Sequence, residues 1–291
     1  MVQFNKISFI GLFSILTLST FAGGWPQPKK SGFFQLSERW MRSNEHFTDK
    51  GLLDPNVTTG LVISSVYGEY GLNNNLTVRA YIPFLVSNFQ NNIISSTRGT
   101  EIEEGQILNA FGDVILGADR LLYKNNKISL TVGVSIGLAT GTIGKDEKQN
   151  LQTGDGENNV AARIDLGASL FNSESLSIYG KLGTAYNKRT KDFSDEIQSQ
   201  AEMGFIIKQK YFIISKFFNV TSMQNGITSG EQISAAGVFA NNAEFNAFEL
   251  LLATDVYKGY HLTFAVNTIL SGKIVANGTA YEVGVFKKIQ W

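Results

Sequence analysis

The sequence predicts an all-β protein, an antiparallel up-and-down transmembrane β-barrel of twelve strands. Three observations favour this fold class: an apolar leader, strand-like segments longer than those of soluble proteins, and short turns that alternate with longer polar connections. Charged residues make up 17% of the chain, below the roughly 25% of average soluble domains. The composition therefore suits strands that present little surface to water.

Residues 1–22 have the pattern of a secretory signal peptide. Lys6 precedes an apolar run from Ile7 to Leu18, and Ala22 offers a small residue for cleavage. A membrane anchor is the alternative, but a spanning helix needs roughly 20 apolar residues. Residues 23–30 are then a short periplasmic segment and residues 31–291 the barrel. We expect localisation in the cell outer membrane, with the lipid bilayer and the barrel-assembly machinery as partners.

Twelve segments of about 11 to 14 residues have strand character and lie near residues 31–43, 58–71, 75–88, 111–123, 127–140, 159–171, 174–187, 197–208, 210–222, 244–256, 259–271 and 278–291. A transmembrane strand needs about 9 to 11 residues, whereas strands of soluble proteins most often have about 5 or 6. Tight turns occupy residues 72–75, 124–127, 172–175, 208–210 and 257–259, and the longer connections occupy 44–57, 89–110, 141–158, 188–196, 223–243 and 272–277. Their alternation places all turns at one end of a meander and all loops at the other.

Side-chain alternation predicts which face of each strand meets lipid. In residues 129–141 the apolar face holds Leu130, Val132, Val134, Ile136 and Leu138. In residues 75–88 it holds Leu76, Val78, Ala80, Ile82, Phe84 and Val86, opposite Arg79 and Tyr81. A soluble sandwich would show the same pattern, so the leader, the strand lengths and the turn alternation favour a barrel with its apolar faces outward.

The opposite faces predict the lumen. The residues placed inward are Arg79, Tyr81, Asp113, Asp119, Arg163, Asp165, Tyr179, Lys181, Glu202, Glu249, Asp255 and Glu282. They either pair across strands and fill the barrel or form a selectivity lining of mixed charge. Twelve strands about 4.7 Å apart, tilted roughly 40°, close at a radius of about 12 Å, which leaves a narrow passage.

Two local features predict function and assembly. Pro83 is the one proline inside a predicted strand, where it costs a ladder hydrogen bond or creates a bulge. This kink is either a bulge without function or a lateral exit into lipid. The last strand places Tyr281, Val283, Val285, Ile289 and Trp291 on one face, which is similar to the C-terminal assembly signal of outer-membrane barrels. Lys287 departs from that pattern and is expected to snorkel at the interface.

Other functional classes have little support. Balanced charge, with 25 basic and 25 acidic residues, argues against nucleic-acid binding, and the lack of Cys excludes thiol chemistry and a lipid anchor on cysteine. We predict no enzyme activity, no cofactor and no metal. Three patterns remain as alternatives: a GxSxG string at Gly133–Gly137, a His261 and Thr263 pair for a lipase, and calcium ligands in Thr153–Asn159.

Four stretches resemble one transporter family. They are "EYGLNNNLTVRAYIPF" from Glu69, "FGDVILGADRLLY" from Phe111, "GLATG" from Gly137 and "TGDGENNVAARIDLGASL" from Thr153. Together with the C-terminal ending they resemble the outer-membrane transporter family named for the meta-pathway of phenol degradation. The resemblance implies a channel-like barrel, distantly similar to fatty-acid transporters, for passive uptake of small hydrophobic or aromatic molecules. A structural or interaction barrel without an open pore is the alternative.

Overall fold

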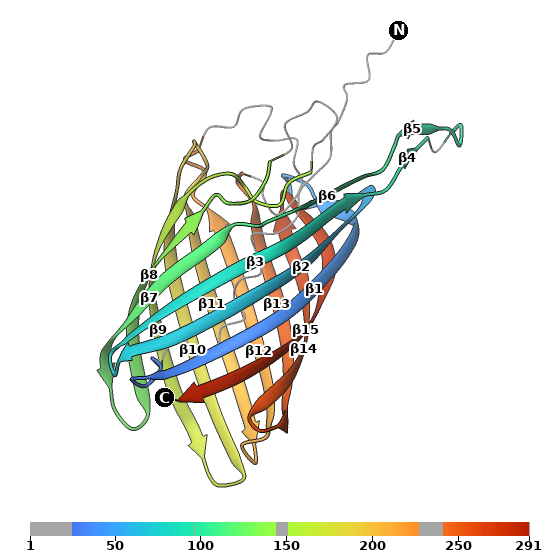
Figure 1. Cartoon of the computed structure of the whole chain (residues 1–291). Helices are drawn as coiled ribbons and strands as arrows, with labels where there is room; N and C mark the ends of the chain where they lie inside the picture. The colour runs from blue at the N-terminus through green and yellow to red at the C-terminus, as the bar shows by residue number, and fades with distance from the viewer. Residues whose placement is uncertain (1–24, 96, 144–150, 227–240, 291) are drawn as a thin grey trace.

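The computed structural model describes residues 25–95, 97–143, 151–226 and 241–290, and they form a closed antiparallel barrel (Figure 1). The wall consists of β1 (Ser31–Phe47), β2 (Leu53–Asn73), β3 (Leu76–Gln90), β6 (Gln106–Ala110) with β7 (Val114–Lys124), β8 (Ile128–Leu138), β9 (Asn159–Asn172), β10 (Leu176–Arg189), β11 (Glu196–Ile207), β12 (Tyr211–Ser222), β13 (Glu244–Tyr257), β14 (Tyr260–Lys273) and β15 (Val275–Gln290). β6 and β7 share one wall position, since both pair with β3. β1 pairs with β15 and closes the ring. The predicted twelve-stranded all-β barrel is confirmed.

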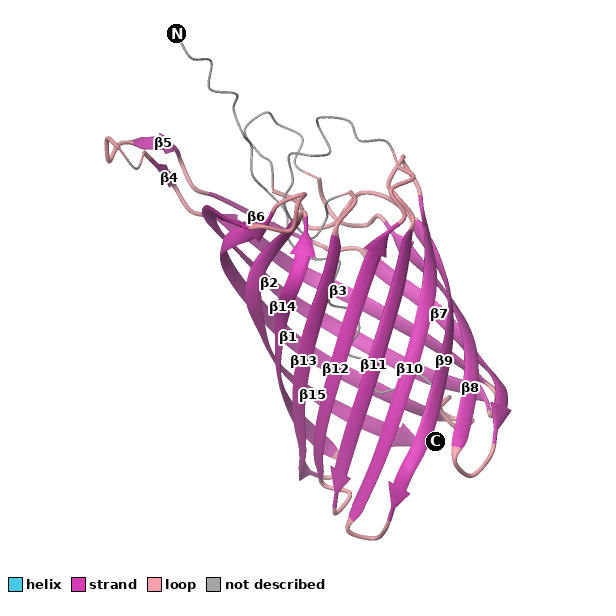
Figure 2. Ribbon diagram, turned by 180° about the vertical axis from the view of Figure 1, so that it is seen from behind, coloured by secondary structure: helices cyan, strands magenta, loops and turns pink. Residues whose placement is uncertain are grey.

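The five predicted tight turns lie at one end of the barrel and the other connections at the opposite end, as Figure 2 shows from behind. The turn between β13 and β14 has two central residues, Lys258 and Gly259, with φ of 47° and 77°. Two positive φ angles are the signature of a type I′ hairpin turn, which matches the twist of the flanking strands. A separate hairpin of β4 (Ile93–Ile94) and β5 (Glu101–Glu103) projects from the loop end. Among the described residues there is no helix long and apolar enough to cross a membrane.

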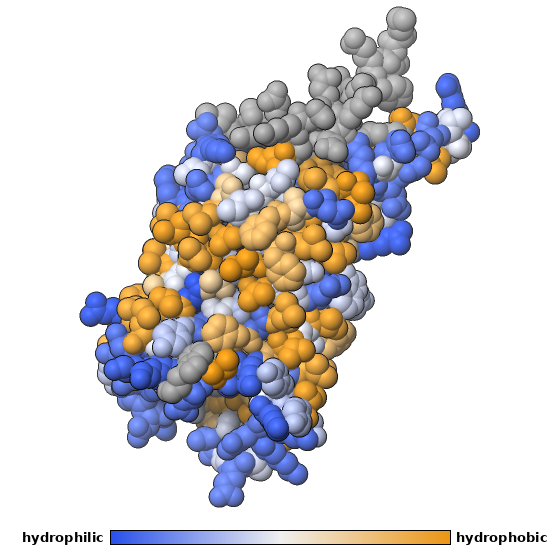
Figure 3. All heavy atoms as spheres, viewed as in Figure 1, coloured by the Kyte–Doolittle hydropathy of each residue, from blue (hydrophilic) through white to orange (hydrophobic). Residues whose placement is uncertain are grey.

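The outer face is an apolar band. In Figure 3 hydrophobic residues cover the middle of the barrel and hydrophilic residues gather at both ends. Val134, Ile136 and Leu182 each have 46% or more of their surface exposed on this face. Lys287 lies 4.2 Å from the centre of the Tyr260 ring, so its charge is held beside an aromatic ring at the turn end. An exposed band of this kind fits hydrocarbon and not water.

The bulge expected as one consequence of Pro83 is present beside it, but the sequence analysis was wrong about which faces Leu85 and Val86 occupy and about Pro83 being the one proline in a strand. Phe84 is an extra residue in the β2 and β3 ladder, because Ser64 pairs with Leu85 while Ser65 pairs with Pro83. This bulge reverses the faces beyond it, so Val86 is buried inside and Leu85 is exposed outside. β2 also begins early enough to include Pro55, so Pro83 is not the only proline in a strand.

The predicted connection at 272–277 is also wrong. β14 runs to Lys273 and β15 begins at Val275, so a single residue separates the two strands. Ile274, with φ of 53°, reverses the chain there. The polar composition of this stretch suggested a loop, but its residues extend the two strands instead.

The interior contains two buried apolar clusters. The cluster toward the loop end consists of Met41, Phe47, Leu61, Ile63, Val86, Phe218, Val220, Phe245, Ala247, Ile269, Val275, Ala276 and Ala280. The cluster toward the turn end consists of Phe33, Tyr67, Phe212, Ile214, Leu251, Ala253, Ala265 and Phe286. Both draw mainly on β1, β2 and β12 to β15. On the half of the inner wall formed by these strands, the side chains are therefore apolar toward the loop end and toward the turn end of the barrel.

Candidate functional site

A ring of acidic and basic side chains, here called the belt, crosses the lumen between the two apolar clusters. Its members are Arg39, Glu69, Arg79, Asp119, Arg163, Asp165, Lys181, Glu202, Lys216, Glu249 and Glu282. From β10 to β13 the charges alternate in direct register, because Lys181 pairs with Glu202, Glu202 with Lys216, and Lys216 with Glu249. Opposite charges directly across a ladder attract. The belt therefore neutralises much of its own charge.

The ion pairs of the belt are short and shielded from water. Arg39 Nη2 lies 2.5 Å from Glu282 Oε2 and 3.6 Å from Glu249 Oε2. Lys216 Nζ lies 3.0 Å from Glu249 Oε1. On the other side of the lumen Arg163 contacts Asp119 at 2.8 Å and Asp165 at 3.2 Å. Such pairs hold side chains in fixed positions, so the belt narrows the lumen rather than leaving a wide aqueous channel.

The structure places most of the predicted lumen residues on the inner face. Arg79, Tyr81, Asp119, Arg163, Asp165, Tyr179, Lys181, Glu202, Glu249 and Glu282 all lie there, buried or half-buried. Asp255 lies near the turn end, 3.9 Å from His261. Asp113 is not in the belt but in the segment between β6 and β7, where it binds a loop. A role of these residues as a selectivity lining stays a prediction.

Sequence reasoning missed three members of the belt and the apolar inner wall. Arg39, Glu69 and Lys216 are buried inside, each beside a partner. Their strands have apolar residues on both faces, as Phe212 and Ile213 illustrate, so the contrast between faces is weak. The signal available in the sequence was the strand period of two, because residues an even number apart share a face. Arg39 lies four residues from Gln35, and Lys216 lies four residues from Phe212, so each pair is on the same face.

A cavity of about 160 Å³ lies between the belt and the loop end. Its floor includes Arg79 and Arg163, its roof includes Arg189, and Phe218 and Phe245 line one side. Engineered apolar cavities of about 150 Å³ bind benzene. The cavity is thus large enough for one small aromatic molecule, with polar groups at two ends and apolar groups at the side.

The barrel wall has a break beside this cavity. β3 pairs with β7 from Leu76 to Tyr81 and with β6 from Val86 to Gln90, but residues 82–85 have no ladder partner on that side. The carbonyl of Pro83 accepts the N–H of Gly112 at 2.9 Å. In an antiparallel ladder the N–H and C=O of one residue point to the same neighbouring strand. The carbonyl of Pro83 faces Gly112, so the N–H that a proline lacks is missing on this side, at the break. Tyr81 and Ile115, the last pair before the break, both line the cavity.

The segment that precedes β1 enters the lumen at the turn end. The Trp25 ring meets the Tyr179 ring edge-on, with centroids 5.7 Å apart, and lies over Gly167, where a Cβ would be 2.8 Å from the indole. Gln27 donates from its backbone to Thr77 at 2.8 Å and from its side chain to Glu69 at 2.9 Å. This segment obstructs the lumen below the belt.

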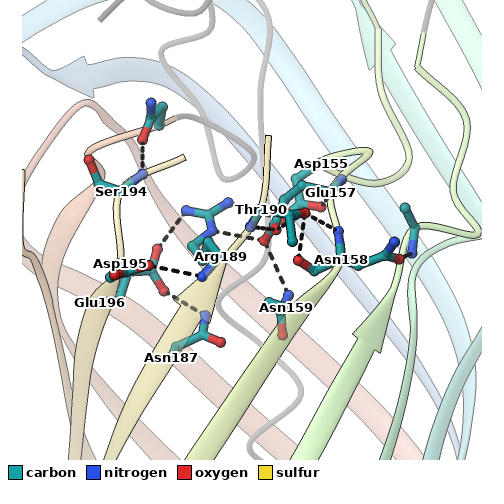
Figure 4. A network of polar contacts seen from close by, with 12 residues as sticks. Asp155, Glu157, Asn158, Asn159, Asn187, Arg189, Thr190, Ser194, Asp195 and Glu196 are labelled. Carbon is teal, nitrogen blue, oxygen red and sulfur yellow. Dashed lines mark hydrogen bonds and ion pairs between the residues drawn. The ribbon is translucent and has the colours of Figure 1, made fainter. Parts of the chain in front are cut away.

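At the loop end a polar network centres on Arg189, as Figure 4 shows. The guanidinium donates to Asp155 at 3.0 Å, Glu157 at 2.9 Å and Glu196 at 2.7 Å. Beside it, Asp195 accepts hydrogen bonds from Tyr186, Lys188, Asn225 and the backbone of Arg189. Desolvation alone would raise the pKa of Asp195, but these hydrogen bonds lower it below its ordinary value. The network ties the loops of β8 to β13 together.

The remaining sequence patterns show other arrangements. Gly133, Ser135 and Gly137 lie within β8, without the sharp turn of a nucleophile elbow. His261 stacks on Phe286 at 4.3 Å near the turn end, with Thr263 buried on the same face. Asp155 and Glu157 in the predicted calcium stretch bind Arg189, and the described part of the chain holds no carboxylate, His or Cys cluster suited to a metal. The predicted signal peptide and Trp291 lie outside the described residues.

Comparisons with known proteins add the following. The COG4313 outer membrane channel from Pseudomonas putida F1 has a TM-score of 0.65 and 12% identity, with 92% of this chain and 98% of that chain covered. The NanC porin has a TM-score of 0.49 and 8% identity over 87% of this chain and 100% of that one. The KdgM porin has a TM-score of 0.47 and 10% identity, with 87% of this chain and 98% of that chain covered. No family model matches the sequence, and no match was found among curated proteins.

The chain has the fold of an outer-membrane channel. The similarity to the Pseudomonas channel covers nearly the whole of both chains, but at 12% identity it shows the fold alone. The two porins score below 0.5 and add no argument. The resemblance to the phenol meta-pathway family stays a prediction, since no family model matches.

Proposed function

We propose that this protein is an outer-membrane channel for passive uptake of small hydrophobic or aromatic molecules, which leave the lumen sideways at Pro83. The observation that supports this most directly is the cavity of about 160 Å³, which has an apolar side and is lined by Tyr81 and Ile115, the strand pair next to the break in the wall. The outer-membrane fold of the Pseudomonas channel supports the membrane location.

The lumen favours a lateral route over a straight one. Below the cavity the belt fills the lumen with paired charges, and below the belt Trp25 and Gln27 lie against the inner wall. An apolar solute would lose contacts and gain none by crossing buried ion pairs. At the break lie residues 82–85 and the segment 111–113, to which the hydroxyls of Thr140 and Thr153 donate hydrogen bonds. On the outer side of the break the side chains of Phe84, Leu85 and Phe111 are exposed toward lipid.

Restoring the missing donor tests the proposal. Pro83→Val supplies an N–H that faces Gly112 and is expected to tighten the seam and lower uptake of small aromatics several-fold in proteoliposomes. The matched control is Pro55→Val, because Pro55 also lies in a strand but at the loop end of β2, where it pairs with Glu45. If Pro83→Val leaves uptake of every aromatic tested unchanged, the lateral exit is wrong.

A second function is an interaction barrel without an open pore. The β4 and β5 hairpin supports it, because it projects away from the barrel (Figure 1) and exposes Ile94 by 61% and Ile102 by 68%. Single-channel recording and uptake assays separate the two functions. A barrel that conducts no ions and admits no aromatic solute would favour the interaction role.

A further inference from the structure

β1 has two charged side chains on its lipid-facing side. Leu36, Glu38, Trp40 and Arg42 are exposed along this side, here called the β1 row, while Arg39 between them points into the belt. Leu36 and Trp40 belong to the apolar outer band, with 55% and 38% of their surface exposed. In the part of the wall that the structure describes, no other acidic side chain points outward from the middle of a strand. Glu38 is therefore an exception to the composition of the outer face.

The surroundings of Glu38 do not neutralise its charge. In the sheet it lies between Val283 of β15 and Ser64 of β2. The hydroxyl of Ser64 donates to Glu38 Oε2 at 3.4 Å, which is a long and weak hydrogen bond. Among the described residues Glu38 has no ion pair. A carboxylate that faces hydrocarbon without a cation is unfavourable, so the single chain leaves Glu38 without the partner that its position requires.

Arg42 is the opposite charge of the β1 row, four residues nearer the loop end. Its neighbours across the ladders are Thr279 and Gly60, and neither supplies an acid. Four residues of strand span about 13 Å, which is too far for Glu38 and Arg42 of one chain to form an ion pair. The β1 row thus presents one anion and one cation at a spacing that keeps them apart within the chain.

We propose that the β1 row is the contact face of a homodimer in the membrane, in which Glu38 of each copy pairs with Arg42 of the other copy. Two copies inserted in the same direction are related by a two-fold axis along the membrane normal, so each contact is made twice. An axis that passes Trp40, midway between the two charges, places Glu38 of one copy on the same side as Arg42 of the other. At a strand tilt of about 40° these residues differ in depth by about 10 Å, which two long side chains that lean toward each other can bridge.

A second copy of the chain fits the β1 row better than lipid does. Lipid tails offer neither a hydrogen bond nor a counter-charge to a carboxylate, whereas a second copy offers both charges at the matching spacing. The row is its own complement, as a two-fold interface requires. The dimer goes beyond the proposed function, since it needs no solute and no exit at Pro83. It concerns the bilayer, because a detergent micelle that surrounds one barrel keeps two copies apart.

Fluorescence energy transfer between barrels in lipid vesicles measures the association. The chain has no Cys, so Lys258→Cys, in the exposed turn between β13 and β14, gives a single labelling site for the native protein and every variant. Donor-labelled and acceptor-labelled barrels are mixed over a range of protein-to-lipid ratios. We expect transfer above the level of random encounters. Glu38→Gln should lower the association constant by at least about tenfold, because each dimer loses two contacts.

Reversal of the charges tests the pairing itself. Glu38→Arg and Arg42→Glu each bring like charges together and should reduce transfer to the random level, whereas the double variant restores opposite charges and should recover it. The matched control is Arg120→Glu, which changes an exposed charge near the turn end of β7 and should leave association unchanged. Migration on gels before and after boiling shows whether each variant is folded. Glu38→Gln changes the side chain least and decides the outcome if a reversal variant does not fold.

Trp40→Cys locates the contact face. Because the axis passes this residue, a short bifunctional thiol reagent should link two copies through it in vesicles. Leu182→Cys, which is exposed on β10, should be linked no more than random encounters allow. Random-level transfer in the native protein would overturn the dimer. Glu38→Gln that associates as the native protein does, or a double variant that associates no better than the single reversals, would overturn the pairing of Glu38 with Arg42.

Discussion

The belt makes a quantitative prediction at Arg39. The side chain of Arg39 is 6% exposed and contacts Glu282 at 2.5 Å and Glu249 at 3.6 Å. In Arg39→Met, Glu249 keeps Lys216 at 3.0 Å, but Glu282 keeps only the amide of Gln35 at 3.2 Å. A buried carboxylate that loses its ionic partner costs roughly 3 to 5 kcal/mol. Because one of the two carboxylates stays paired, we expect the free energy of unfolding to fall by about 3 kcal/mol.

Equilibrium unfolding in urea, with the barrel in detergent micelles and tryptophan fluorescence as the signal, measures this loss. The double variant Arg39→Met with Glu282→Gln removes the stranded charge and should recover about 2 kcal/mol, since a neutral pair of similar size is tolerated. Arg42→Met, three residues along the same strand but exposed on the outside, should change stability by less than about 0.5 kcal/mol. A loss of unfolding free energy below about 1 kcal/mol in Arg39→Met would refute the reasoning, because a loss of that size is expected for an ion pair exposed to water.

Two further predictions concern the ends of the lumen. Trp25→Ala removes the indole that packs on Tyr179 and Gly167, so single-channel conductance should rise several-fold. The control Trp40→Ala, on the outer face, should leave the conductance unchanged. Equal conductance in both variants would show that Trp25 does not obstruct the lumen. The lowered pKa of Asp195 means that its stabilising contacts are fully present above about pH 4 and are lost as pH falls further. Protection factors of the amides of residues 223–226, corrected for the intrinsic exchange rate at each pH, should therefore fall in acid, and Asp195→Asn should show the low protection already at neutral pH. A variant as well protected as the native protein would contradict this.

The sequence predicted the meander because its signals are local. Strand 159–171 alternates strictly, so Arg163 and Asp165 were assigned to the inner face from period two alone. Turn residues separate strands at intervals that any antiparallel barrel requires. The prediction failed where one residue changes the period, since the bulge at Phe84 moved Val86 to the other face. Pro83 predicted that a bulge could occur here, but the position of the extra residue is a property of the ladder between two strands and cannot be read from the pattern of one.

The site could be predicted only in part, because its decisive contacts are distant in sequence. Asp113 was placed in the lumen by parity, but it binds Asp155, which lies 42 residues away in a loop. Arg189 was not assigned any role, since its predicted position fell in a polar connection. Two of its three carboxyl partners come from the connection between β8 and β9 and the third from the neighbouring strand β11, and only the folded chain brings them together.

The contact between Arg39 and Glu282 joins the first wall strand to the last across 243 residues of chain. No shorter piece of the protein can form it, so it belongs to the final step of biogenesis, when the sheet edge at β1 meets the edge at β15. Until then both edges are open templates for pairing with other chains. A charged pair at that meeting point stabilises the one register that brings the two residues opposite each other. It therefore favours closure of the barrel over pairing of its edges with another chain.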